Sequence, residues 1–221
     1  MRRRMIFADR AEAGRLLAER LAGLDFQAPL VLALPRGGVP VAAEIARALA
    51  APLDVAFVRK LGAPHQPELA VGAVADGDDP EIVLNDELVH ALGLTEDYIT
   101  AAASRELAAI EQRRREYAHL RPAVEPAARA VIVVDDGVAT GMTMRAALRH
   151  VKRGKPNRLI AAVPVASREA VALLRREADE VVCLAAPRSF GSVGSFYRDF
   201  HQVSHDEVAG LLREALARGR T

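Results

Sequence analysis

The chain has 221 residues, 51% of them hydrophobic, and a mean hydropathy of +0.07, so it can bury a sizeable core within one domain. No apolar run reaches the ~18 residues that cross a bilayer, the net charge of +1 gives no reason to expect nucleic-acid binding, and the single Cys183 excludes an internal disulfide and a cysteine-based zinc site. We therefore expect one domain over residues 1–221, located in the cytoplasm, with neither a membrane nor a nucleic acid as its partner.

Helical and strand-like patterns alternate along the chain, which is typical of an α/β domain with a mainly parallel sheet. In the first half the sequence predicts a helix from residues 9 to 24, a strand at 30–34, a helix at 39–50, a strand at 53–58, a loop at 61–71, a strand at 71–75, a turn at 76–80, an edge strand at 82–84 and a helix at 95–120. In the second half it predicts a strand at 131–134, a helix at 142–152, a strand at 159–165, a helix after Ser167, a strand at 181–184 and a helix at 208–217. Asp9 with Glu12, and Ser204 with Glu207, have the spacing of a capping box at a helix start.

The most informative segment reads VIVVDDGVATGMT over residues 131–143. Its four β-branched residues can cross a core as a strand, but Asp135 and Asp136 cannot follow them without partners, so we expect both carboxylates at a solvent-facing strand end. Ligands of open parallel sheets bind beyond such ends. Small residues and two hydroxyl groups follow, and they let backbone N–H groups approach a phosphate at the start of a helix: Gly137, Ala139, Thr140, Gly141 and Thr143. Carboxylates beside an anion cradle suit a sugar phosphate.

Other sites that place acids after a strand differ from this one in spacing. A haloacid-dehalogenase-type phosphatase needs two aspartates separated by one residue, whereas Asp135 and Asp136 are adjacent. A receiver domain carries its acid pair after the first strand, and this pair lies two-thirds along the chain. The glycines of a dinucleotide fingerprint and the Gly-Lys-Ser/Thr of Walker A are missing. An acidic turn that caps a helix is the remaining alternative, and it does not explain Thr-Gly-Met-Thr.

Residues 131–143 resemble the phosphoribosyl-pyrophosphate motif of the type I phosphoribosyltransferases, in which apolar residues, two acids and Thr-Gly-x-Thr follow one another. The resemblance covers a core of residues 30–184 and implies a three-layer, parallel-sheet fold with a small variable hood built from the N-terminal and C-terminal flanks. It implies that Asp135 and Asp136 contact the ribose hydroxyls, and that residues 139–143, including Met142, hold the 5′-phosphate.

The same resemblance implies an activity and its partners. The 5-phosphoribosyl group would pass from phosphoribosyl pyrophosphate to a nitrogenous base, and pyrophosphate would be released. Mg²⁺ would be bound mainly through the phosphoribosyl pyrophosphate rather than by a protein metal site, and the protein would be a homodimer. The chain looks like an uncharacterised branch of the family, so a non-catalytic regulatory protein that binds phosphoribosyl pyrophosphate is the alternative.

Arg36, Gly37 and Gly38 occupy the place of the pyrophosphate loop of this family, which often contains a non-proline cis peptide bond. An ordinary glycine turn into a helix is the alternative for this loop. Arg59 and Lys60, at the predicted end of the next strand, suit the charge that develops on departing pyrophosphate. A solvated Arg-Lys pair is the alternative there.

Residues 61–72 resemble in position the mobile catalytic loop that closes over the substrate in this family. Ala63 stands where the orotate enzymes have a lysine, which is a departure from their pattern. His65 is retained as a candidate because a histidine follows in those loops, and no role for Glu68 follows from the sequence.

Four aromatic residues crowd into a short C-terminal segment of a chain that is only 4% aromatic: Phe190, Phe196, Tyr197 and Phe200. Through Phe190 and Tyr197 this segment resembles the base-stacking region of hypoxanthine-type enzymes, whereas a small satellite core is the alternative that we favour slightly. His201 and His205 lie four residues apart but lack the acid of a HExxH zinc site. The sequence therefore leaves the acceptor base undefined.

Overall fold

The computed structural model describes residues 7–77, 79–118, 120 and 124–218. In chain order its elements are α1 (Arg10–Leu21), β1 (Leu30–Ala33), α2 (Gly38–Ala48), β2 (Leu53–Val55), β3 (Val58–Ala63), β4 (Gln66–Ala75), β5 (Glu81–Leu84), α3 (Asp86–Ala91), α4 (Glu96–Ala118), β6 (Ala130–Val134), α5 (Met142–Arg153), β7 (Arg158–Val165), α6 (Arg168–Leu174), β8 (Glu180–Ala185), the 3-10 helix η1 (Val193–Phe196) and α7 (His205–Arg218). None of the helices in the described part of the chain combines the length and the apolar character that crossing a membrane requires.

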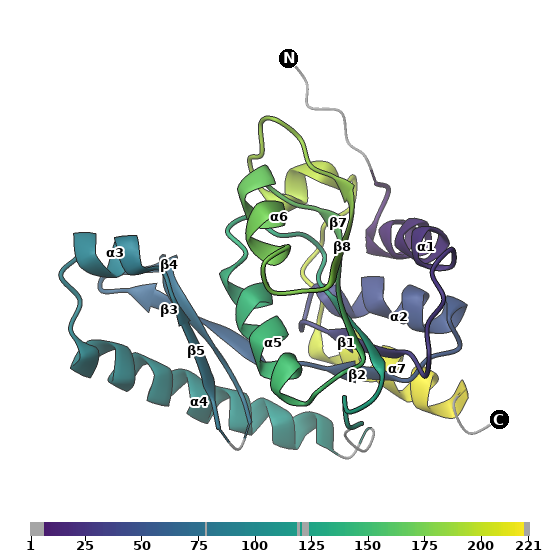
Figure 1. Cartoon of the computed structure of the whole chain (residues 1–221), viewed down its shortest axis with the longest axis horizontal. Helices are drawn as coiled ribbons and strands as arrows, with labels where there is room; N and C mark the ends of the chain where they lie inside the picture. The colour runs from purple at the N-terminus through teal and green to yellow at the C-terminus, as the bar shows by residue number, and fades with distance from the viewer. Residues whose placement is uncertain (1–6, 78, 119, 121–123, 219–221) are drawn as a thin grey trace.

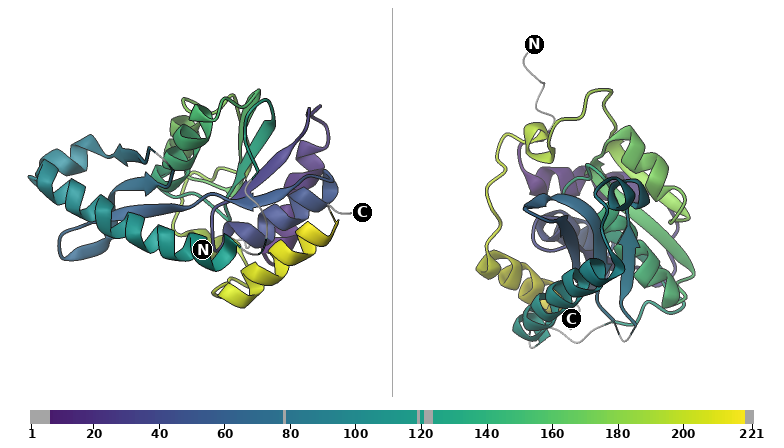
Figure 2. Two further views of the ribbon diagram at one scale, coloured as in Figure 1. Left: turned by 90° about the horizontal axis from the view of Figure 1, so that it is seen from below. Right: turned by 90° about the vertical axis from the view of Figure 1, so that its left-hand side faces the viewer.

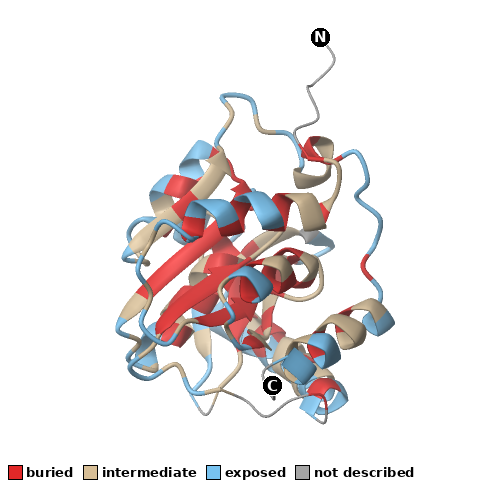
Figure 3. Ribbon diagram, turned by 90° about the vertical axis from the view of Figure 1, so that its right-hand side faces the viewer, coloured by how far each residue is buried: buried red, intermediate tan, exposed pale blue. Residues whose placement is uncertain are grey.

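The central sheet has five parallel strands in the order β2-β1-β6-β7-β8. β6 is its middle strand and is buried on both faces, which explains its continuous apolar sequence. Val131 and Val133 pack with α5 and α6 on one face, whereas Ile132 and Val134 pack with α1, α2 and α7 on the other. The buried strands lie between the helices in Figure 3. This arrangement confirms the predicted three-layer α/β fold with a parallel sheet.

A second, antiparallel sheet is formed by β3, β4 and β5 in that order. One side of this sheet packs on α5 through Ala73, Ala75 and Val83, and Leu61 and Val71 pack against α4. The sheet, α3 and α4 form a lobe that projects to one side of the central sheet (Figures 1 and 2). The predicted edge strand at 82–84 and the long helix at 95–120 are confirmed as β5 and α4, whereas α3 was not predicted.

The loop predicted at 61–71 is wrong, because these residues belong to the β3–β4 hairpin. A Cβ atom at Gly62 would lie 2.7 Å from the Pro67 carbonyl oxygen, so the two strands approach closely at this point. The ladder is also irregular between Leu61 and Ala63. Glycine and proline here mark an irregular hairpin rather than the absence of a strand.

The single strand predicted at 53–58 is divided between the two sheets. β2 ends at Val55 in the central sheet, and β3 begins at Val58 in the second sheet. Arg59 and Lys60 therefore lie inside β3 instead of at the carboxyl end of a central strand, which corrects the predicted placement. An apolar run shows that residues are buried, but it does not show which sheet they join.

Local signals at helix starts agree with the structure. Asp9 caps α1 by accepting a hydrogen bond from the backbone N–H of Glu12 at 2.7 Å, and the Glu12 side chain accepts one from the N–H of Ala8. The first bond is that of a capping box, whereas the second reaches the residue before the cap instead of the cap residue itself. The backbone N–H of Glu207 likewise donates to Ser204 Oγ at 3.1 Å, near the start of α7.

Candidate functional site

The paired acids follow β6 at the carboxyl end of the central sheet. The backbone N–H of Leu34 donates to the Val134 carbonyl at 2.8 Å, which brings the end of β1 beside the acids. Asp135 Oδ1 accepts a hydrogen bond of 2.9 Å from the backbone N–H of Asp136. Both acids follow the strand end as predicted and are partly buried, with the Asp136 side chain 15% exposed. The loop after β1 and two segments near the ends of the described chain pack against them.

The loop after β1 packs directly against the acids. Its Pro35–Arg36 peptide bond is cis, as the family resemblance implied for this loop. A Cβ atom at Gly37 would lie 2.1 Å from Asp136 Oδ2, and one at Gly38 would lie 2.7 Å from the Val134 carbonyl oxygen. Glycine is therefore required at both positions by the close approach of this loop to the acids, which an ordinary glycine turn would not demand.

Arg10, the first residue of α1, forms a largely buried salt bridge with the acid pair. Its Nε atom lies 2.8 Å from Asp136 Oδ2, and the two side chains are only 8% and 15% exposed. Its Nη1 atom donates to the His201 carbonyl at 2.8 Å, and its guanidinium carbon lies 3.9 Å from the ring centroid of Phe200. Arg10 was missed from the sequence, because nothing local distinguishes it from other arginines that follow a helix cap.

The two neighbouring acids have different electrostatic environments. Burial raises the pKa of Asp135 well above its ordinary value, and the charge of Asp136 raises it further. Burial also raises the pKa of Asp136, but the hydrogen bond and the charge of Arg10 act in the opposite direction. Adjacent buried carboxyls resist joint ionisation. Asp136 therefore ionises more readily than Asp135, whose ionisation is opposed both by burial and by the charge of its neighbour.

The segment that follows the acids is pinned to the end of β7. The backbone N–H of Val138 donates to the Val165 carbonyl at 2.9 Å, and the backbone N–H of Ser167 donates to the Val138 carbonyl at 3.0 Å. Ser167 Oγ also donates to the Ala139 carbonyl at 2.7 Å. Ser167 had been predicted only as a helix start, and its role in holding this loop was missed. The loop is thus fixed before any ligand arrives.

The loop leads into α5 through Gly141, whose φ of +84° is in the region that favours glycine. Ala139 and Thr140 are exposed, Thr143 is partly exposed and Met142 is buried in the core. Gly141 offers no side-chain cap, and the first backbone N–H groups of a helix have no acceptor within the helix. The start of α5 therefore presents backbone donors beside the acids, whereas the Met142 side chain anchors the helix.

Two segments near the ends of the described chain lie over the acid pair, residues 7–10 and 193–201, and we call them the cover. The backbone N–H of Phe7 donates to the Phe196 carbonyl at 3.0 Å, and that of Arg198 donates to the Phe7 carbonyl at 2.9 Å. Tyr197 Oη donates to the Asp136 carbonyl at 2.5 Å. Burial raises the pKa of Tyr197, so this hydroxyl stays protonated as a donor. Gly137 also belongs to this contact, because a Cβ atom there would lie 2.4 Å from a methyl group of Val193.

The aromatic residues of the cover form a satellite core. Tyr197 is 3% exposed, and its ring centroid lies 5.3 Å from that of Phe7 and 5.0 Å from that of Phe200. Phe190, which is partly buried, stacks on Phe196 at 5.4 Å. These contacts favour the satellite-core interpretation over base stacking by Tyr197, because its ring already packs against two others.

The cations predicted to meet pyrophosphate lie on β3 in the lobe. Arg59 Nε lies 2.8 Å from Glu106 Oε2 on α4, and both side chains are about one-third exposed. Lys60 is exposed on β3. His65 has a φ of +61° in the exposed turn of the β3–β4 hairpin. A catalytic role of Arg59 and Lys60 stays a prediction.

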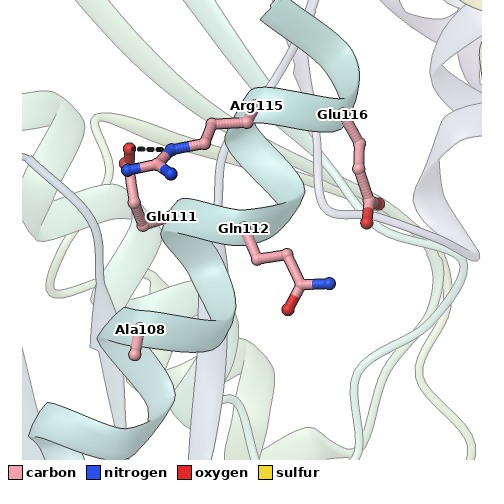
Figure 4. Close-up of a pocket in the computed structure, with 5 residues that line it drawn as sticks. All are labelled: Ala108, Glu111, Gln112, Arg115 and Glu116. Carbon is pink, nitrogen blue, oxygen red and sulfur yellow. Dashed lines mark hydrogen bonds and ion pairs between the residues drawn. The ribbon is translucent and has the colours of Figure 1, made fainter.

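A shallow hollow on the exposed side of α4 is lined by other residues, among them Glu111, whose Oε1 lies 2.9 Å from Arg115 Nε (Figure 4). None of the predicted site residues lines this hollow.

His201 lies between Asp199 at 3.1 Å and Glu207 at 3.3 Å, and hydrogen bonds to these two acids raise its pKa. Over the described residues, no group of three or more histidine, cysteine or acidic side chains is arranged to hold a metal ion.

Open parallel sheets bind ligands beyond the carboxyl ends of their strands, and helix starts with open backbone donors suit phosphate groups. The acid pair after the middle strand, followed by the start of α5, combines both features. The chain belongs to the phosphoribosyl transferase domain family, whose family model matches residues 5–201. The family assignment that rested on residues 131–143 is thereby confirmed.

Individual relatives agree with this assignment. Two proteins from Mycobacterium tuberculosis strains, each named "Putative phosphoribosyl transferase", are 45% identical over 210 residues, which cover 95% of this chain and 47% of the relative. The chain thus spans about half the length of these curated relatives. The crystal structure of TT1426 from Thermus thermophilus is 46% identical, with a TM-score of 0.81 over 95% of this chain and 99% of that one. The AQ2163 protein from Aquifex aeolicus, at 11% identity and a TM-score of 0.50, covers 79% of this chain and 73% of its own and shows the fold alone.

Proposed function

We propose that this protein transfers the 5-phosphoribosyl group from phosphoribosyl pyrophosphate to a nitrogenous base and releases pyrophosphate. One observation carries the proposal. Asp135 Oδ1 and Asp136 Oδ2 are held by protein donors, whereas Asp135 Oδ2 and Asp136 Oδ1 accept no hydrogen bond from another described residue. Two acceptors remain, one on each acid, beside a helix start that offers backbone donors. This set matches the two hydroxyls and the 5′-phosphate of a ribose 5-phosphate group.

Each part of the site has a proposed role. Asp135 and Asp136 accept hydrogen bonds from the ribose hydroxyls, and residues 139–143 hold the 5′-phosphate through their backbone N–H groups and the hydroxyls of Thr140 and Thr143. Arg36, Gly37 and Gly38 approach the pyrophosphate, since their loop lies against the acids. Arg59 and Lys60 would supply positive charge to the departing pyrophosphate.

The proposed reaction is a displacement at the anomeric carbon. The bond from that carbon to a pyrophosphate oxygen breaks with its electron pair, a bond to the acceptor nitrogen forms, and the proton of that nitrogen passes to the departing pyrophosphate or to water. The protein mainly positions the two reactants and stabilises the departing negative charge. Mg²⁺ would supply further charge stabilisation, and it would be carried mainly by phosphate oxygens and water, as this ion tends to be when a substrate offers phosphates.

Three further statements belong to the proposal. The cover forms the variable hood of a single domain, because it contacts both the acid pair and the loop that follows it. The acceptor is a nucleobase-like compound that enters beside the cover. A homodimer and a cytoplasmic location are expected from the family resemblance, and size-exclusion chromatography with light scattering would test the dimer.

A non-catalytic protein that binds phosphoribosyl pyrophosphate is the second candidate. The observation that favours it is the packing of Tyr197, whose ring contacts Phe7 and Phe200 instead of facing an acceptor. A regulator needs the ribose phosphate site but no site for a base.

The deciding experiment measures pyrophosphate release with a panel of purine and pyrimidine bases, beside calorimetric binding of phosphoribosyl pyrophosphate with Mg²⁺. We expect binding, and release with at least one base. Asp135→Asn should abolish both, because Oδ1 is held by the N–H of Asp136 and the amide NH₂ would replace the acceptor Oδ2. Asp25→Asn removes an exposed acid and should change neither. Binding without release for every base would favour the regulator, and no binding at millimolar concentration would overturn both.

A further inference from the structure

Arg10 is a buried cation that connects three parts of the chain. It belongs to α1, it pairs with an acid at the end of β6, and it donates to the carbonyl of His201 in the C-terminal part of the cover. Phe200 packs against the face of its guanidinium group. An arginine this deeply buried needs such partners, because an unpaired charge in the interior is costly.

The contact with Arg10 decides which oxygen of Asp136 remains available to a ligand. Arg10 engages Oδ2 of Asp136, which also lies against the backbone of Gly37. The carboxylate is therefore held on one side and can turn only its Oδ1 atom toward a ligand. Free rotation of the carboxylate would instead present either oxygen in several directions.

We infer that Arg10 is a positioning residue. It holds the carboxylate of Asp136 so that one oxygen accepts a hydrogen bond from a sugar hydroxyl, and it also connects the cover to that site. The inference rests on the proposed function, since it assigns a role within the same ribose phosphate site. Arg10 itself acts through Asp136 and does not touch the sugar.

The groups around Asp136 predict how its pKa should change when Arg10 is replaced. A purely structural role of Arg10 would not predict this change. Arg10 from α1 contributes a positive charge, Asp135 contributes an acid on the same strand end, Tyr197 from the cover donates its hydroxyl to the Asp136 carbonyl, and the loop after β1 contributes Gly37. Removing the charge of Arg10 takes away the main effect that opposes burial at Asp136. The Asp136 carboxyl should then hold its proton up to a higher pH.

The first measurement needs no ligand. The carboxyl carbons of ¹³C-labelled aspartates are followed by NMR during a pH titration of the wild type, Arg10→Gln and Arg15→Gln. Arg15 is an exposed arginine on the same helix and serves as the matched control. We expect the Asp136 signal to titrate at a higher pH in Arg10→Gln only. An unchanged Asp136 titration in a folded Arg10→Gln variant would overturn the inference, whatever the protein binds.

The second measurement uses ribose 5-phosphate as the probe and calorimetry at pH 7. Arg10→Gln should weaken binding about tenfold or more, Arg10→Lys should weaken it less because the charge is kept while the fork geometry is lost, and Arg15→Gln should leave it unchanged. In an Asp136→Asn background the Arg10→Gln change should have little further effect, because the two residues act as a unit.

The outcomes separate the inference from the proposed function. Binding by the wild type that is equally strong in Arg10→Gln would overturn only the role of Arg10. A failure of the wild type to bind would overturn the proposed function, and the NMR titration would still decide whether Arg10 sets the state of Asp136. If Arg10→Gln does not fold, Arg10→Lys carries the binding test, and unchanged affinity in that variant overturns the inference.

Discussion

The carboxyl end of the central sheet and the three-stranded sheet of the lobe use charge in different ways. Arg10 and Asp136 are paired at side-chain exposures of 8% and 15%, whereas Arg59 and Glu106 are paired at 37% and 30%. A pair that is largely removed from water depends on both partners, while a pair at the surface is screened by water. Substitutions in these two regions should therefore have effects of different size.

A large effect on binding is expected from Gly37→Ala. The new methyl group would lie 2.1 Å from Asp136 Oδ2, so either the loop after β1 or the acid must move. We expect binding of phosphoribosyl pyrophosphate to weaken about 100-fold or more and the free energy of unfolding to fall by ~1–3 kcal/mol. Calorimetry and denaturant unfolding would measure both.

Gly210→Ala is the matched control for that change. Gly210 lies in α7, and a Cβ atom there meets nothing within 4 Å. Alanine is favoured over glycine by ~0.5–1 kcal/mol inside a helix, so this variant should be slightly more stable and bind normally. Normal binding by Gly37→Ala as well would contradict the close packing of the loop on the acids.

Asp136→Asn tests the buried pair directly. The substitution leaves the Arg10 charge buried without its carboxylate, so we expect the free energy of unfolding to fall by ~3 kcal/mol and sugar phosphate binding to weaken about tenfold or more. Denaturant unfolding at pH 7 is the measurement. A loss below ~0.5 kcal/mol would show that water reaches Arg10 and that the two regions do not differ as described.

Asp135→Asn should have a smaller effect of opposite sign on stability. Because burial raises the folded-state pKa of Asp135 above the ordinary value of 3.8, the folded protein binds this proton more tightly than the unfolded chain does. Ionisation of Asp135 therefore costs stability as the pH rises from about 3.8 through the folded pKa. The variant should be more stable than the wild type by ~1 kcal/mol at pH 8, and this gain should vanish near pH ~4. A gain that does not depend on pH would contradict this cause.

The smallest effect is expected from Arg59→Gln in the lobe. Its pair with Glu106 is partly exposed, so we expect a loss of ~0.2–1 kcal/mol, further reduced at high salt. Thermal unfolding at low and high salt would measure it. A loss comparable to that of Asp136→Asn would remove the contrast between the two regions.

Much of the central sheet could be predicted from the sequence, because its strands are apolar runs and because α1 and α7 begin at caps that the sequence shows. β6, α5 and β7 lie where the patterns at 131–134, 142–152 and 159–165 placed them, to within a residue or two. The lobe was harder to predict. Its β3–β4 hairpin contains Gly62 and Pro67 at a close approach of the two strands, and this contact has no periodic pattern.

The sequence alone determined the α/β class, the family and the acid pair, because each depends on residues that are neighbours in the chain. Only the tertiary structure decided which oxygen of each acid is engaged, which ring Tyr197 packs against and how the run at 53–58 divides between two sheets. The Arg10–Asp136 pair joins residues that are 126 positions apart. No local pattern encodes such a contact, because it exists only after α1, β6 and the cover have packed together.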